Sequence, residues 1–137
     1  MAGEISPLVA SLQVALGGAG GAVLRYHVGR AVTGLAGPGN AFPWGTLAVN
    51  LVGSLAMGVL VGWLARGTAS AQTGESVWLL VGVGLLGGFT TFSAFSSELV
   101  TLVHRGQPGL AAGYAAASLI AGMAAIIIGL VAAQSVQ

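Results

Sequence analysis

Hydrophobic residues fall into four long runs along the chain, separated by short polar or glycine- and proline-rich segments. The runs cover approximately residues 8–32, 44–65, 77–103 and 110–133. A helix of about 20 apolar residues crosses the ~30 Å hydrocarbon core of a bilayer, and each run reaches that length. Because the connecting segments are too short to hold a soluble domain, the pattern predicts an all-α membrane protein. We expect residues 1–137 to form a single four-helix transmembrane domain.

The third run is interrupted by polar residues near its middle. Residues 87–98 combine two glycines, five hydroxyl side chains, three phenylalanines and one glutamate. Glycine costs about 1 kcal/mol relative to alanine in a helix, and β-branched Thr90 and Thr91 weaken the helix further. We therefore expect the third helix to be broken near the membrane midplane, within residues 87–91. Its freed carbonyls would form a candidate ion site; the alternative is that Gly87 and Gly88 only let another helix cross closely.

The amino-acid composition excludes several classes of function. Hydrophobic residues make up 55% of the 137 positions and charged residues only 5%, against roughly 25% charged residues in soluble domains. A net charge of +1 from scattered arginines gives no basic patch for nucleic acid. The chain has no cysteine and two isolated histidines, so it offers no thiolate or zinc site. The sequence also lacks a P-loop and any evident Ser-His arrangement, and we expect no enzyme.

The arginines give only a weak preference for one membrane orientation. With four spans, both termini and the middle loop share one side, where Arg66 is the only fixed cation. Arg30 and Arg105 lie on the other side, joined by Arg25 if its side chain snorkels outward. A difference of one or two arginines does not fix one topology, so we hypothesise insertion in both directions and pairing of two opposed copies as an antiparallel dual-topology homodimer.

Small residues recur every four positions in two of the runs. In the second run they are Ser54, Gly58 and Gly62; in the fourth they are Gly113, Ala117, Ala121, Ala125 and Gly129. Such stripes let helix backbones approach closely. They serve packing either within one subunit or between two subunits, and the sequence leaves both possibilities open.

Polar and aromatic side chains inside the runs are candidates for lining an ion path. Phe92 and Phe95 share a helix face just after the expected break. They are either packing residues or rings whose positive edges meet a dehydrated anion. Asn50, supported by the hydroxyls of Thr46 and Ser118, is likewise either a helix-joining amide or a pore-lining donor.

Arg25 and Glu98 are the ionisable groups that lie plainly within the runs. A charge near the bilayer centre costs about 2.5 to 3.5 kcal/mol on the insertion scale, so each should have a partner. The first and third runs end on the same side of the membrane, and both residues lie roughly 8 to 10 Å below those ends. We therefore hypothesise that Arg25 and Glu98 pair as structural charges.

Three motifs in the chain resemble the signatures of the Fluc (CrcB-like) fluoride ion channels. They are Gly-Gly-Phe-Thr-Thr-Phe-Ser-Ala-Phe-Ser at 87–96, Trp-Gly-Thr-Leu-Ala-Val-Asn-Leu-Val-Gly at 44–53 and Gly-Gly-Ala-Gly-Gly-Ala-Val-Leu-Arg-Tyr at 17–26. The resemblance extends to the chain length, the four spans and the run Gly-Tyr-Ala-Ala-Ala-Ser at 113–118. It therefore covers essentially the whole chain.

The resemblance implies a passive fluoride-selective channel, assembled as an antiparallel dual-topology homodimer with two pores. By analogy, the pore residues would be Asn50, Thr91, Phe92, Ser93, Phe95 and Ser118. The backbone carbonyls of Gly87 and Thr90 would hold a structural Na⁺ at the dimer interface. Arg25 would match the family's arginine near the end of the first helix, and Glu98 its carboxylate after the phenylalanine motif. Two positions depart from the pattern, since Ala94 and Gly122 stand where relatives often have hydroxyls.

The physiological role implied by the resemblance is export of fluoride across the cytoplasmic membrane of a bacterium or archaeon. Two alternatives remain. A small multidrug-type exporter would call for a carboxylate deep in the first span, and this first span has none. A non-conducting structural membrane subunit would make Asn50, Phe92 and Phe95 packing residues.

Overall fold

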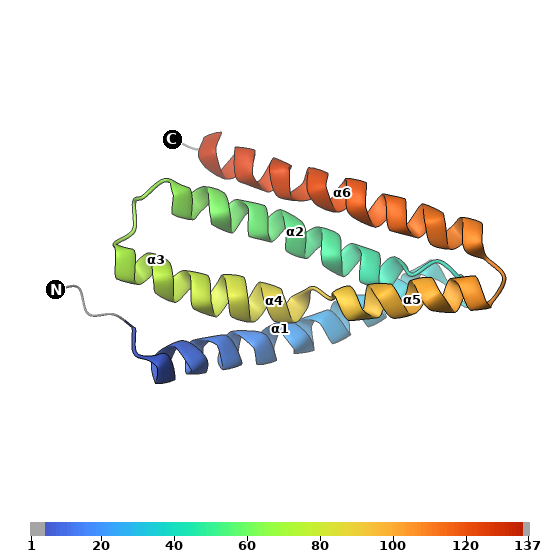
Figure 1. Ribbon diagram of the computed structural model, residues 1–137, viewed down its shortest axis with the longest axis horizontal. Helices are drawn as coiled ribbons and strands as arrows, with labels where there is room; N and C mark the ends of the chain where they lie inside the picture. Colours follow the sequence, from blue (N-terminus) through green and yellow to red (C-terminus); the bar gives the residue numbers. More distant parts are fainter. Residues whose placement is uncertain (1–4, 136–137) are drawn as a thin grey trace.

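The computed structural model describes residues 5–135 as a bundle of helices in which consecutive spans run antiparallel (Figure 1). The helices are α1 (Pro7–Ala36), α2 (Trp44–Ala65), α3 (Ala71–Val77), the π-helical η1 (Trp78–Leu86), α4 (Gly87–Phe89), α5 (Phe92–His104) and α6 (Pro108–Ser135). Within the described residues there is no strand, and four helical stretches are long and apolar enough to cross a membrane. The predicted all-α membrane class is therefore confirmed. Residues 1–4 and 136–137 of the predicted domain lie outside the described range.

The helix ends follow local sequence signals. Ser6 caps α1 by accepting a hydrogen bond from the Val9 N–H at 3.4 Å, and Pro7 occupies the first helical position. At the other end, Gly37 terminates α1 with a φ of +86°, a conformation that glycine adopts readily. The candidate spans Pro7–Ala36, Trp44–Ala65, Ala71–His104 and Pro108–Ser135 enclose the four predicted runs.

The third span is helical through both glycines and breaks immediately afterwards. Gly87 has ordinary helical angles, φ −63° and ψ −38°, whereas Thr90 and Thr91 are extended, with ψ of 160° and 122°. The break thus falls at the C-terminal end of the predicted range 87–91. Hydroxyls account for this position: the Thr90 Oγ1 donates to the Leu86 carbonyl at 2.9 Å, and the Thr91 Oγ1 caps α5 by accepting from the Ala94 N–H at 3.2 Å.

Glycines bring the helix backbones into contact in two pairs. In α1, a Cβ added at Gly17 or Gly21 would overlap a backbone carbonyl oxygen of η1. Gly88 meets the Gly18 backbone in the same way, so the close-crossing role holds for this glycine. Between α2 and α6, Gly58 approaches the Ile126 carbonyl and Gly129 approaches that of Leu55. Gly58 and Gly62, two of the small residues that recur in the second run, therefore pack against α6 of the same subunit.

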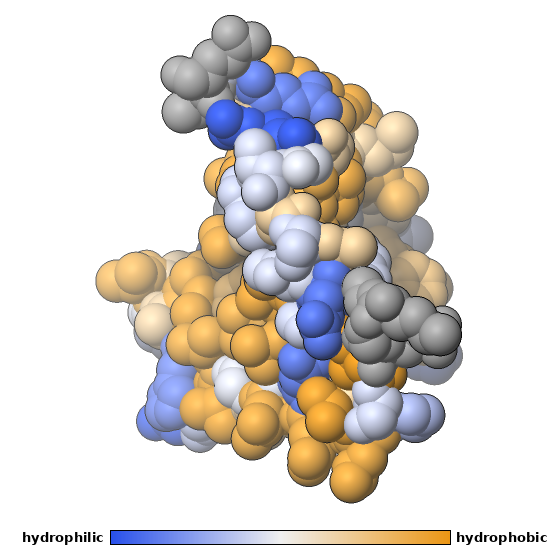
Figure 2. Space-filling model, turned by 90° about the vertical axis from the view of Figure 1, so that its left-hand side faces the viewer, coloured by the Kyte–Doolittle hydropathy of each residue, from blue (hydrophilic) through white to orange (hydrophobic). Residues whose placement is uncertain are grey.

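The main buried cluster lies between α2, α5 and α6. It consists of Leu47, Phe95, Leu102, Ala111 and Tyr114. Many large apolar side chains are nevertheless exposed, among them Leu16 on α1 and Ile120 on α6, at 71% and 70%. Figure 2 shows the end of the molecule that carries both chain ends, with hydrophilic residues along a central band and hydrophobic residues on the flanks. Exposed apolar side chains on the flanks are expected for a helix bundle that is surrounded by lipid.

Candidate functional site

The helix break is held by a reciprocal pair of hydrogen bonds from α2. The Thr91 N–H donates to the Asn50 Oδ1 at 2.8 Å, and the Asn50 Nδ2 donates to the Thr91 carbonyl at 3.0 Å. Asn50 therefore satisfies both backbone groups of a residue that has left the helix, where no water could do so in lipid. An amide nitrogen carries two N–H donors, so one donor of Asn50 is left for a ligand.

A cavity of about 330 Å³ opens beside the hydrogen-bonded pair Asn50 and Thr91. Its lining residues come from α2, the break, α5 and α6: Asn50, Gly53, Ser54, Met57, Thr90, Thr91, Phe92, Phe95, Ser118, Leu119 and Ile126. The Ser118 hydroxyl is buried and has no hydrogen-bond partner within residues 5–135. A hydroxyl without a partner in a largely apolar cavity is suited to a ligand with lone pairs.

The two phenylalanines differ in their environment. Phe95 belongs to the core at 9% exposure, whereas Phe92 is 78% exposed at the edge of the cavity. Their ring centroids lie 5.8 Å apart with planes inclined at 45°. Thr91 and Phe92 also form the N-terminal end of α5, where the helix dipole is positive. The cavity wall therefore combines amide and hydroxyl donors, a positive helix end and aromatic rings, all of which favour an anion.

The structure thus brings together five of the six predicted pore residues. Ser93 is the exception: its exposed hydroxyl lies 3.2 Å from the Thr91 Oγ1 and does not line the cavity. Sequence reasoning missed Ser54 and Met57 as lining residues, although they follow Asn50 by four and seven positions and so share its helix face. Gly122 packs beside Ser54, whose Oγ lies 3.8 Å from the position of an added Cβ.

The hypothesis that Arg25 pairs with Glu98 is wrong. The Arg25 Nη1 donates to the Thr90 carbonyl at 3.2 Å. Glu98 instead accepts from the Thr46 hydroxyl at 2.6 Å and from the Tyr114 hydroxyl at 2.7 Å. The helix break supplies Arg25 with a carbonyl, and hydroxyls on α2 and α6 satisfy the carboxylate, so neither group needs the other.

A second cavity, of about 360 Å³, lies next to Glu98. Its polar lining residues are Thr33, Asn40, Thr46, Glu98, Thr101 and Arg105. Thr46 precedes Asn50 by one helical turn, and Glu98 follows Phe95 by one turn. The two cavities therefore occupy consecutive turns of α2 and α5, which places polar groups along a considerable length of the bundle.

The carbonyls of Gly87 and Thr90, which were predicted to bind a cation, differ in their hydrogen bonding. In a continuous α-helix the Thr91 N–H would bond to the Gly87 carbonyl, but here it bonds to Asn50. Gly87 is also an exposed residue, and a carbonyl oxygen without its helical donor is free to accept another partner. The Thr90 carbonyl accepts from Arg25 and has one lone pair left. Within residues 5–135 no cluster of His, Cys, Asp or Glu could hold a metal ion.

These features define a small multi-pass membrane protein whose polar groups gather at a break in its third span. The family model of CrcB-like protein, Camphor Resistance (CrcB), matches residues 12–130, and the chain belongs to this family. It is 58% identical over 123 residues to the fluoride-specific ion channel FluC of Novosphingobium aromaticivorans, covering 90% of this chain and 94% of that protein. The fluoride-specific ion channel FluC of Erythrobacter litoralis is 52% identical over 128 residues, 92% and 93% of the two chains. The resemblance drawn from the three motifs is confirmed.

Proposed function

We propose that this protein is a passive fluoride-selective ion channel. The observation that carries the proposal is its 58% identity, over 90% of the chain, to a protein named as a fluoride-specific ion channel. The cavity beside the helix break supports it, because Asn50 and Ser118 present unused donors there. The names of the relatives also agree with the prediction that the chain is not an enzyme.

Fluoride is a small, strongly hydrated anion, so a pore must replace its water with donors. The free N–H of Asn50 and the hydroxyls of Thr91 and Ser118 can do this, with the edges of Phe92 and Phe95 completing the shell. Glu98 would repel an anion, but both of its oxygens accept hydrogen bonds from neighbouring hydroxyls. These hydroxyl donors partly offset the repulsion between the carboxylate and an anion.

The assembly that fits this cavity is an antiparallel dual-topology homodimer with two pores. The cavity is open on the surface of one chain, and Phe92 is 78% exposed beside it. Polar groups at this depth need protein or water rather than lipid, and a second copy would enclose them. The weak arginine bias is compatible with opposed insertion.

Dual topology predicts that each terminus is found on both sides of the membrane. Single cysteines placed near the N-terminus and near the C-terminus of this cysteine-free chain should be labelled by an impermeant maleimide from inside and from outside. Labelling should therefore reach about half of the molecules from each side. Labelling from one side only would contradict opposed insertion while leaving the conduction proposal open.

A structural Na⁺ between the two copies would be held by the carbonyls of Gly87 and Thr90 from each chain. When bound, such a cation would satisfy the lone pairs of carbonyls freed by the helix break. Gly87, an exposed residue, provides a carbonyl without its helical donor, and Thr90 provides one remaining lone pair. Oxygen ligands of this kind suit a hard monovalent cation.

The physiological role proposed is export of fluoride across the cytoplasmic membrane of a microbe. HF diffuses inward and loses its proton in the more alkaline cytoplasm, which traps the anion. An inside-negative potential is worth about 2.3 kcal/mol per charge per 100 mV. A passive pore is therefore sufficient for export, without a nucleotide-driven pump.

Flux from liposomes tests the function directly. Vesicles loaded with potassium fluoride and containing the purified protein should release fluoride when valinomycin is added under an outward potassium gradient. Vesicles loaded with potassium chloride should release almost no chloride. Absence of fluoride release would favour a non-conducting structural subunit, and comparable chloride release would contradict selectivity. A small multidrug-type exporter is disfavoured because α1 contains no carboxylate.

A further inference from the structure

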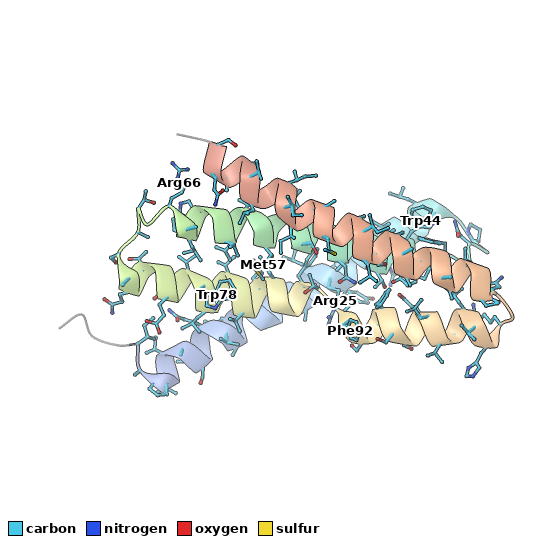
Figure 3. All side chains as sticks on the ribbon, turned by 45° about the horizontal axis from the view of Figure 1, so that its top comes forward. Arg25, Trp44, Met57, Arg66, Trp78 and Phe92 are labelled. Carbon is cyan, nitrogen blue, oxygen red and sulfur yellow. The ribbon has the colours of Figure 1, made fainter. Side chains whose placement is uncertain are left out.

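The side chain of Arg25 reaches from α1 to the end of the first half of the broken helix. Its Nη1 donates to the carbonyl of Thr90, the residue that follows α4, at 3.2 Å. In the view of Figure 3, both Arg25 and Phe92 project to the region of the break in the third span. Arg25 is partly buried, so this contact is screened from bulk water.

No carboxylate neutralises Arg25 within residues 5–135, because Glu98 is occupied by Thr46 and Tyr114. The charge is balanced instead by the Thr90 carbonyl and by the negative end of the helix Ala71–Phe89. A guanidinium is charged at all accessible pH values. The break therefore carries a permanent positive charge belonging to the chain itself.

We propose that Arg25 sets the cation affinity of the site formed by Gly87 and Thr90. This inference rests on the proposed cation site, since Arg25 and the cation would share the Thr90 carbonyl. The guanidinium takes one of the two lone pairs of that oxygen and polarises the other. It also places a like charge beside the cation in a low-dielectric environment, where charge repulsion is strong. Both effects weaken sodium binding relative to a neutral side chain at this position, so Arg25 lowers the affinity of the site for its cation.

The experiment measures the thermal stability of the purified full-length protein in detergent across a sodium chloride titration. N-methyl-D-glucamine chloride keeps the ionic strength constant. In Arg25→Met the sodium concentration that gives half of the stabilisation should fall about tenfold or more relative to wild type. Arg25→Lys keeps the charge and should keep a midpoint close to that of wild type. Arg25→Gln, which is neutral but retains a donor for Thr90, is the second variant if Arg25→Met does not fold.

Arg30→Met is the matched control, since Arg30 is exposed on the same helix and its Nη1 donates to the Tyr26 hydroxyl at 3.1 Å rather than to a carbonyl. Its sodium midpoint should not move. If Arg25→Met or Arg25→Gln is less stable by the same amount at every sodium concentration, with an unchanged midpoint, Arg25 is only structural and the proposal is overturned. If sodium stabilises neither wild type nor the Arg25 variants, the cation site itself is rejected, whereas fluoride flux would still test the channel.

Discussion

Replacement of Gly21 with alanine is expected to prevent the protein from folding. A Cβ at this position would overlap the Leu85 carbonyl oxygen and lie 2.7 Å from the Phe89 nitrogen. Overpacking costs about 1 to 3 kcal/mol where side chains can move aside. Here both obstructing atoms are backbone, and separating α1 from the third span would also disturb the neighbouring Gly17 and Gly88 contacts. We expect a loss above about 3 kcal/mol, seen as loss of the folded peak in size-exclusion chromatography and of fluoride flux.

Gly20→Ala is the control for Gly21→Ala. It makes the same chemical change one position earlier on α1, where the nearest atom to an added Cβ is the flexible Leu85 Cδ1 at 3.6 Å. This variant should fold and keep wild-type flux, because the contact is an ordinary one and alanine favours the helix over glycine. Equal behaviour of the two variants would contradict the close backbone packing of α1 on the third span.

The four spans could be predicted from sequence because apolar length is a local property. The run 44–65 coincides with α2, Trp44–Ala65, and the other predicted runs lie inside the corresponding candidate spans. The third span shows the limit of this reasoning. Its helix begins at Ala71, six residues before the predicted start, because Ser70 caps a polar turn through the Thr73 N–H at 3.2 Å. Hydrophobicity does not register such a turn.

The location of the break and the partners of the charges depended on contacts between distant segments. Helix propensity identified residues 87–91, but the position of the break at Thr90 and Thr91 depends, besides their own hydroxyls, on Asn50, 41 residues earlier, which satisfies the Thr91 backbone. The similar depth of Arg25 and Glu98 in the membrane was the reason for predicting that they pair. Depth did not reveal that a free carbonyl at Thr90 lies 3.2 Å from Arg25.

The residue types of the candidate site could be predicted from the sequence, but the hydrogen bonds and packing contacts of these residues could not. Asn50 and Ser118 were candidate site residues because polar groups inside a span need partners. Their roles differ in a way that only the fold reveals: Asn50 is bonded twice to Thr91, whereas the Ser118 hydroxyl lacks a partner within residues 5–135. Leu119 and Ile126 carry no polar signal, so their place in the cavity lining depended on how α2 packs against α6.

Asn50→Ala is expected to reduce fluoride flux in liposomes at least about 100-fold, given the proposed channel. The substitution removes the donor left for the anion. It also deprives the part-buried Thr91 N–H and carbonyl of their partners, at about 1 to 3 kcal/mol for each group. A loss of about 2.7 kcal/mol in barrier stabilisation already corresponds to a 100-fold slower rate. The thermal midpoint should fall, but the helix pairs held by glycine contacts should keep the protein folded.

Two further variants separate the anion-binding role of Asn50 from its structural role. Asn50→Asp keeps an acceptor for the Thr91 N–H but replaces the amide donor with negative charge. It should therefore conduct no better than Asn50→Ala even if it is more stable. Gln13→Ala removes another partly buried amide within a span, on α1 and outside the cavity lining, and should leave flux unchanged. If Asn50→Asp restored conduction, Asn50 would serve only to hold the break, and the anion shell would have to be built from the hydroxyls of Thr91 and Ser118 instead.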